Sequence, residues 1–246
     1  MVRLTNRIVG CIFVIFTFFM FSCSNHADEH NTLTDQEKKD GWAVLFDGST
    51  MNGWHLFNNG NIPSAWSVDS GRLVCNPHAK DVKHGDLVTD KSYENFDLVF
   101  EWKISRSGNS GVFINVQESP EYATTWSTGP EYQLLDNANN EEHGTDSLRM
   151  AGSLYGMTAL KNKVASKPFQ EWNQSRILQQ NGKITFWLNG VVTVEEDIHS
   201  DIWKTLVSGS SLGKFPAFGA ATKGKLALQD WTNGVAFRDI KIKELP

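Results

Sequence analysis

Cysteine is scarce in this chain, with three in 246 residues. Two of them, Cys11 and Cys23, lie in or beside an N-terminal apolar run, so Cys75 has no partner left for an internal disulfide. Positive charge is also in short supply, because the net charge is −5 and falls to −7 without Arg3 and Arg7. This balance argues against nucleic acid as a partner, which requires a basic stripe. Stability must come from an apolar core, for which the nine Trp and fifteen Phe supply material.

Long hydrophobic runs are absent apart from Ile8 to Phe21. That run is shorter than the roughly 20 residues of a comfortable membrane span. It follows Arg3 and Arg7 and ends at Ser22-Cys23, which is typical of an export signal over residues 1–22. Cys23 is then either the lipidated first residue of a bacterial lipoprotein or an incidental cysteine after an ordinary signal. We expect an exported protein, periplasmic or held at the outer membrane by a lipid anchor alone.

Helical periodicity is also rare after this segment. Residues 23–40 are polar and predict a flexible tether, because they lack the apolar surface needed to fold alone. Beyond them, short alternating stretches are separated by Gly, Asn, Asp and Pro, and a short helical turn is expected over Asp197–Lys204. The predicted strands are Trp42–Phe46, Trp66–Val68, Gly71–Cys75, Phe96–Ile104, Gly111–Val116, Tyr132–Leu135, Arg176–Gln180, Lys183–Leu188, Gly190–Glu195, Lys225–Gln229 and Ala236–Lys243. The pattern predicts an all-β antiparallel sandwich or jelly roll, one domain over 41–246.

Asn-Gly pairs mark two of the turns. Asn181-Gly182 and Asn189-Gly190 are strong hairpin signals, so residues 176–195 are expected to form a three-stranded meander. The stretch GWAVLFDGSTMNGW, from Gly41 to Trp54, is apolar on both faces of its strand. It is therefore interpreted as a first strand and glycine turn with a packed Trp, in preference to a binding site.

Several blocks of the chain resemble the 3-keto-disaccharide hydrolase family. Besides GWAVLFDGSTMNGW, the blocks in order are SGNSGVFI (107–114), GPEYQLLDN (129–137), AGSLYGM (151–157), WNQSRI (172–177), FWLNGV (186–191) and GKLALQDWTNGVAFRDIKIKEL (224–245). The resemblance implies a concanavalin A-like jelly roll that cleaves glycosides whose C3 hydroxyl has been oxidised to a ketone. The chain departs from the common pattern at Trp231, where the family usually has His, and at Ile114-Asn115, where Arg is frequent.

Polar side chains recur on one face of several predicted strands. Strand alternation sets Glu131 and Gln133 against Tyr132 and Leu134, and it places Asp230 on the packed side. By the same alternation, or by their place in the blocks above, the candidate substrate-binding residues are Gln133, Asn109, Asn115, Lys103, Asp136, Tyr155, Gln229 and Trp231. Amides, carboxylates and an aromatic together suit a sugar cleft, although a plain solvated face would also explain them.

Cleavage of a 3-keto-glycoside needs a base for the C2 proton and a group that stabilises an enolate. Glu131 is the first candidate for the base or for a metal ligand, Glu101 is the second carboxylate, and His143 lies in the polar loop that follows. A divalent metal is a candidate cofactor, as is calcium in the loop from Asp136 to Asp146, although no ligand motif marks either. The alternatives are a non-catalytic carbohydrate-binding module and, ranked last, a conventional two-carboxylate glycosidase.

Overall fold

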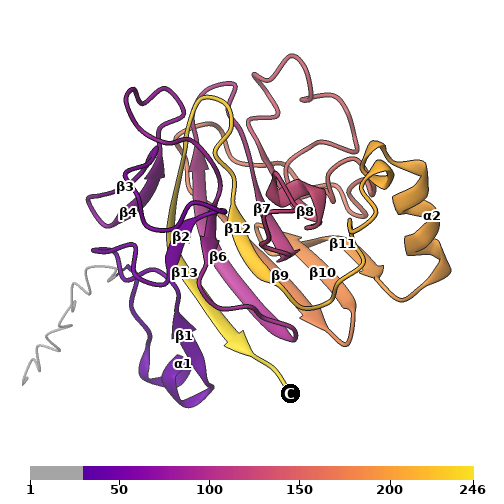
Figure 1. The fold of residues 1–246 in the computed structure, drawn as a ribbon, viewed down its shortest axis with the longest axis horizontal. Helices are drawn as coiled ribbons and strands as arrows, with labels where there is room; N and C mark the ends of the chain where they lie inside the picture. The colour runs from indigo at the N-terminus through magenta and orange to yellow at the C-terminus, as the bar shows by residue number, and fades with distance from the viewer. Residues whose placement is uncertain (1–29) are drawn as a thin grey trace, which may run out of the picture.

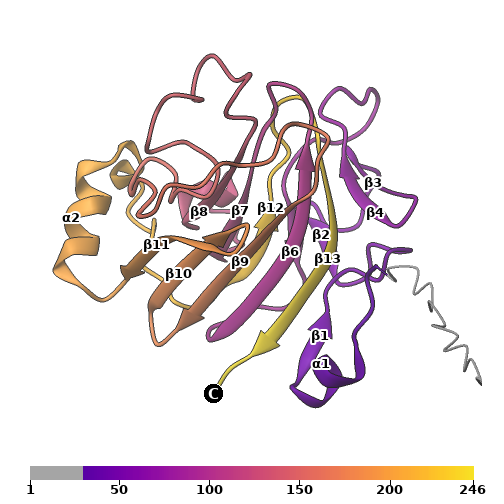
Figure 2. The ribbon, with the colours of Figure 1, turned by 180° about the vertical axis from the view of Figure 1, so that it is seen from behind.

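The computed structural model describes residues 30–246 and folds them into two antiparallel β-sheets packed face to face (Figures 1 and 2). The eight-stranded sheet has the order β11-β10-β9-β6-β13-β4-β3, with β1 also paired to β13, and the five-stranded sheet has the order β2-β5-β12-β7-β8. This confirms the all-β, concanavalin A-like jelly-roll sandwich. The predicted signal peptide and the lipidation of Cys23 fall outside the described residues.

The strands match most of the predicted segments. The eight-stranded sheet contains β1 (Trp42–Val44), β3 (Trp66–Asp69), β4 (Arg72–Cys75), β6 (Phe96–Ile104), β9 (Asn173–Gln180), β10 (Lys183–Leu188), β11 (Val191–Asp197) and β13 (Val235–Glu244). The five-stranded sheet contains β2 (Trp54–Leu56), β5 (Leu87–Thr89), β7 (Asn109–Val116), β8 (Glu131–Leu135) and β12 (Lys225–Leu228). The sequence analysis missed β2 and β5, because each has three residues and shows no alternation of its own.

The core lies between the two sheets and is rich in aromatic rings. Phe100, Trp102 and Phe237 of the larger sheet face Tyr132 of the smaller one, and all four are at most 2% exposed. The rings of Phe100 and Tyr132 meet edge to face with centroids 5.9 Å apart. Each such buried side chain contributes on the order of 2 kcal/mol, so the core holds the sheets together without a disulfide.

The predicted meander of β9, β10 and β11 is confirmed. Its two turns hold Asn181 and Gly182 at φ of 52° and 76°, and Asn189 and Gly190 at 48° and 82°. These left-handed conformations suit Asn-Gly and match the twist of the flanking strands. In the first stretch, the indole of Trp54 is buried and donates to the carbonyl of Leu45 at 2.6 Å, which confirms the packed interpretation.

Residues 30–40 differ from the predicted tether, because they pack on the domain. Thr34 caps α1 (Asp35–Lys39) in a capping box with Glu37, and Glu37 in turn pairs with Lys241 of β13 at 2.8 Å. The backbone amide of Asn31 donates to Asp239, and the amide of Asp239 donates back to the side chain of Asn31. The composition is too polar for a core, but short-range caps and ion pairs to a sheet suffice to order it.

A second helix follows β11 along the chain. α2 (Asp201–Gly209) begins four residues later than the predicted helical turn and leads into the short 3-10 helix η2 (Ser211–Lys214). Figure 1 shows α2 at one end of the sandwich and α1 at the other, with long loops between β7 and β9 above the sheets. Within residues 30–246, no helix has the length and apolarity to cross a membrane.

Candidate active site

A cleft of about 440 Å³ lies on the outer face of the five-stranded sheet, around the start of β8. Strands, the loop before β9 and η2 all contribute to it. Its lining comprises Asn109, Trp126, Glu131, Glu142, His143, Arg149, Tyr155, Ser211, Leu212, Lys214, Phe215, Gln229 and Trp231. We call this space the acidic cleft, after Glu131 in its wall. Six of the eleven residues predicted for the site meet here, and Gln133 lies beside them.

Glu131 is the central charged group of the acidic cleft. Its neighbours Tyr132 and Leu134 face the core, so alternation turns Glu131 outward, yet it is only 6% exposed. Its carboxyl lies over Gly111 of β7, where an added Cβ would come within 2.0 Å of Oε1. The carboxyl has no hydrogen bond or ion pair with residues 30–246. Burial, and then the charge of Asp86, raise the pKa of Glu131 well above its usual range.

Tyr155 and Arg149 flank this carboxyl. The backbone amide of Tyr155 donates to the carbonyl of Glu131 at 3.0 Å, which fixes the two residues side by side. Burial and the charge of Glu131 raise the pKa of Tyr155, whereas Arg149 opposes both. The guanidinium of Arg149 lies 5.6 Å from the centre of the Tyr155 ring and is held by Asp146 at 2.5 Å. Tyr155 therefore stands next to the buried acid, and the cation of Arg149 lies against Tyr155.

Several nearly buried polar atoms of this region lack partners within the described chain. These are Nδ1 of His143, Oε1 of Gln133 and Nε of Arg149. His143 is 9% exposed and packs edge to face against Tyr155 at 6.2 Å. Gln133 donates its amide to Asn109 in the wall of the cleft. Buried polar groups normally have hydrogen bonds, so these three atoms mark a polar region beneath the surface of the cleft.

Aromatic rings form the other side of the acidic cleft. Trp126 meets Phe215 edge to face at 5.1 Å, and Trp231 is 56% exposed. Aromatic faces bind the C–H surfaces of sugars, while the amides and carboxyl opposite can bind hydroxyls. The arrangement therefore suits a carbohydrate.

The comparisons with known proteins agree with this chemistry. The family model for the 3-keto-alpha-glucoside-1,2-lyase-like domain matches residues 41–243. The chain belongs to this family. A 3-keto-disaccharide hydrolase of Bacteroides thetaiotaomicron is 33% identical over 249 residues, spanning 92% of this chain and 86% of that protein.

Two solved structures from Parabacteroides distasonis ATCC 8503, both provisionally assigned as glycosyl hydrolases, share the family's fold. The first is 36% identical, with a TM-score of 0.81 over 89% of this chain and 100% of that one. The second is 23% identical, with a TM-score of 0.63 over 83% of this chain and 99% of that one, and shows the fold alone.

Four predicted residues lie away from the acidic cleft. Glu101 and Lys103 project from the outer face of the eight-stranded sheet, because Phe100 and Trp102 of β6 face the core. The whole sandwich therefore separates Glu101 from Glu131, which corrects the prediction that they share a site. Stacked sheets alone are about 10 Å apart, so these two carboxylates do not form a conventional glycosidase pair.

Asn115 and Asp136 serve the fold. Asn115 has φ of 58°, and its amide donates to Gln179 of the opposite sheet at 2.7 Å, so it ties the two sheets together. The carboxyl of Asp136 accepts from the amide of Ser107 at 2.9 Å and from Asn139, and it shapes the loop after β8. Both are nearly buried, and neither lines the acidic cleft.

Arg149, Trp126 and Phe215 were missed by the sequence analysis. Arg149 lies in an irregular loop, Trp126 lies in the short 3-10 helix η1 (Thr125–Ser127), and Phe215 directly follows η2, so strand alternation says nothing about them. Asp86 was missed as well, and it lies just before the short strand β5.

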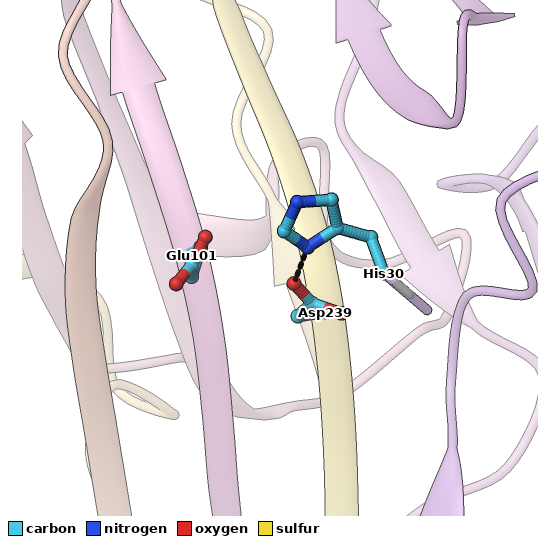
Figure 3. Close-up of side chains that lie close together, drawn as sticks. All are labelled: His30, Glu101 and Asp239. Atoms are coloured by element: carbon cyan, nitrogen blue, oxygen red, sulfur yellow. Dashed lines mark hydrogen bonds and ion pairs between the residues drawn. The ribbon is translucent and has the colours of Figure 1, made fainter. Parts of the chain in front are cut away.

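A cluster of metal-ligand side chains does occur, but on the far sheet. In the described part of the chain, the potential ligand atoms of His30, Glu101 and Asp239 all lie within 4.8 Å of one another. Figure 3 shows His30 reaching over β13 to Asp239 while Glu101 stands on the neighbouring strand. Nδ1 of His30 is 2.6 Å from Asp239, and Glu101 pairs with Arg238 at 2.7 Å. These ion pairs explain the cluster without a metal, because they attach the N-terminal segment to the eight-stranded sheet.

The acidic cleft itself gathers no comparable group of three ligand side chains among residues 30–246. The carboxyl of Glu131 lies over Gly111, and the exposed carboxyl of Glu142 is 3.7 Å from His143. The residues present therefore do not fit a metal centre, and no step below is routed through one. A divalent cofactor stays a prediction from the sequence, as does calcium in the loop from Asp136 to Asp146.

Proposed function

We propose that this chain is a carbohydrate-cleaving enzyme that breaks the glycosidic bond of 3-keto-glycosides, with Glu131 as the base. The observation that carries the proposal is the carboxyl of Glu131, which is buried in the acidic cleft, has no hydrogen-bond partner among residues 30–246 and has a raised pKa. A raised pKa makes the ionised carboxylate a stronger base. Membership in the family and the named relative supply the substrate class.

The ketone at C3 makes the reaction accessible to a carboxylate. Glu131 takes the proton from C2. The electrons of that C–H bond form a double bond between C2 and C3, and the π electrons of the ketone move to the C3 oxygen, which gives an enolate. When the enolate collapses, a double bond forms between C1 and C2, and the substituent leaves C1 with its bonding electrons and takes up a proton. Addition of water across the double bond then gives the free 3-keto sugar, so the net reaction is hydrolysis.

Tyr155 and Arg149 are suited to stabilise the enolate. The hydroxyl of Tyr155 donates to the C3 oxygen as negative charge develops there, and the cation of Arg149 favours that charge through its contact with Tyr155. His143 packs edge to face against the Tyr155 ring and helps to hold it in place. In a nearly buried site such groups act without a large reorganisation of water.

The test compares turnover of a nitrophenyl 3-keto-glucoside with that of its unoxidised parent. The wild type should cleave the keto substrate alone, because the unoxidised sugar has no acidic C2 proton. Glu131→Gln should abolish turnover, whereas the matched variant Glu101→Gln, on the other sheet, should retain it. Turnover of the keto substrate is also measured in the presence of a chelator, and loss of turnover there would support the predicted metal cofactor.

Two results would overturn the proposal. The first is equal turnover by wild type and Glu131→Gln. The second is binding of unoxidised oligosaccharides without turnover of any keto substrate, which would make the chain a carbohydrate-binding module.

A further inference from the structure

A second hollow borders the acidic cleft on the same sheet. This second hollow has a volume of about 570 Å³ and is lined by residues that include Asn59, Lys83, His84, Asp86 and Thr124. Three side chains line both spaces: Trp126, Gln229 and Trp231. The two spaces therefore adjoin at these side chains.

Trp231 lies where the two hollows adjoin, and hydrogen bonds hold the residues on either side of it. The preceding Asp230 carboxyl accepts from His84 at 3.0 Å, from the amide of Gly85 at 3.0 Å and from the thiol of Cys75 at 3.2 Å. The carbonyl of the following Thr232 accepts from the amide of Asn109 at 3.1 Å. Fixed on both sides, the indole is nevertheless 56% exposed, and it is one of four large hydrophobic side chains so exposed in residues 30–246.

An aromatic ring held in the open between two polar hollows is suited to stack on a sugar ring. The far side of the second hollow offers Lys83, Asn59 and Thr124 as hydrogen-bonding groups for hydroxyls. His84 has both ring nitrogens engaged, by Asp230 and by the carbonyl of Ala79 at 3.0 Å, so it shapes the wall. Phe57 and Pro77 add apolar surface.

We infer that the second hollow binds the departing sugar of a 3-keto-disaccharide, stacked on Trp231, while the keto ring occupies the acidic cleft. The inference rests on the proposed function and adds to it the place where the second sugar ring binds. Trp231 then determines specificity for the leaving group and takes no part in proton transfer.

The experiment measures kcat/KM for two substrates with Trp231→Ala, Lys83→Ala and wild type. One substrate is a methyl 3-keto-glucoside, which fills only the acidic cleft, and the other is a 3-keto-disaccharide of two glucose units. Trp231→Ala should lower kcat/KM for the disaccharide by about 10-fold or more, the size expected for loss of one apolar contact. The methyl glycoside should lose several-fold less than the disaccharide with Trp231→Ala, because it lacks the second ring. Lys83 lines the second hollow alone, so Lys83→Ala should lower kcat/KM for the disaccharide more weakly and leave the methyl glycoside unchanged.

Ile202→Ala is the matched control, because Ile202 is also exposed, at 69%, but lies on α2 and lines neither hollow. It should leave both substrates unchanged. Equal losses on both substrates with Trp231→Ala, or no loss on the disaccharide, would overturn the inference while the proposed function stands. Wild type that cleaves neither keto substrate would instead overturn the proposed function.

Discussion

Replacement of Asp86 by Asn should stabilise the protein at neutral pH and leave it almost unchanged in acid. Asp86 accepts hydrogen bonds from the hydroxyl of Thr125 and from the amide of Asp230 at 2.9 Å. Burial nevertheless dominates and raises the pKa of Asp86 to about 6 from an ordinary 3.8, with the charge of Asp230 adding to it. Asn can keep both contacts, because its oxygen accepts from the amide and the Thr125 hydroxyl can turn to accept from its NH₂ group.

The magnitude follows from the two pKa values. The unfolded chain releases the Asp86 proton near pH 3.8 and the folded chain near pH 6, so stability falls as pH rises between them. Each pKa unit corresponds to about 1.4 kcal/mol, which gives an upper bound of about 3 kcal/mol for the penalty above pH 6. At pH 4 the penalty is below about 1 kcal/mol.

Thermal unfolding followed by Trp fluorescence at pH 4 and at pH 7.5 measures this difference. For a chain of this size, about 3 kcal/mol raises Tm by up to roughly 6 to 12 °C, and the gain should be confined to pH 7.5. Asp47→Asn is the control of opposite sign, since hydrogen bonds from Thr50 and Ser49 lower the pKa of Asp47. That variant should lose stability at pH 7.5 and less of it in acid. An equal gain for Asp86→Asn at both pH values would refute the reasoning.

Four further outcomes are expected. In Asp86→Asn the acidic limb of the pH profile of kcat/KM should move to lower pH, because Asp86 raises the pKa of Glu131; an unmoved limb would contradict the coupling. Gly111→Ala should cost about 100-fold in turnover by displacing the Glu131 carboxyl, and wild-type turnover would show that the carboxyl can shift freely. Tyr155→Phe should lower kcat by about 10- to 100-fold with little change in KM, whereas a change confined to KM would indicate binding alone. Asp239→Ala should lower Tm and expose residues 30–40 to proteolysis, and an undiminished resistance to protease would argue against their docking.

Strand alternation predicted the orientation of the key carboxylate. Glu131 faces outward because Tyr132 and Leu134 face the core, and the two-residue period of a strand needs no tertiary information. Each Asn-Gly turn could likewise be predicted from two residues, since only a few residue types accept its backbone conformation. These parts of the fold could therefore be derived from short stretches of sequence.

The sheet to which each strand belongs could not be derived in this way. Glu101 and Glu131 each lie on a solvent-facing strand surface, but β6 and β8 belong to different sheets, so the two residues are on opposite outer faces. Alternation also fails at Asn115, where a left-handed residue interrupts the strand. Arg149 and Phe215 reach the cleft only through loop closure, which depends on contacts between residues far apart in the chain.

The docking of the N-terminal segment also limits the distance between the domain and a lipid anchor on Cys23. His30 and α1 are fixed to the eight-stranded sheet, at the end of the sandwich away from α2 (Figures 1 and 2). If Cys23 carries a lipid, as the sequence predicts, six residues separate it from His30, and an extended chain over those seven Cα–Cα steps spans at most about 25 Å. The domain would then lie close to the bilayer in a limited range of orientations. The end that carries α2 would face away from the membrane, where it is accessible to sugars in solution.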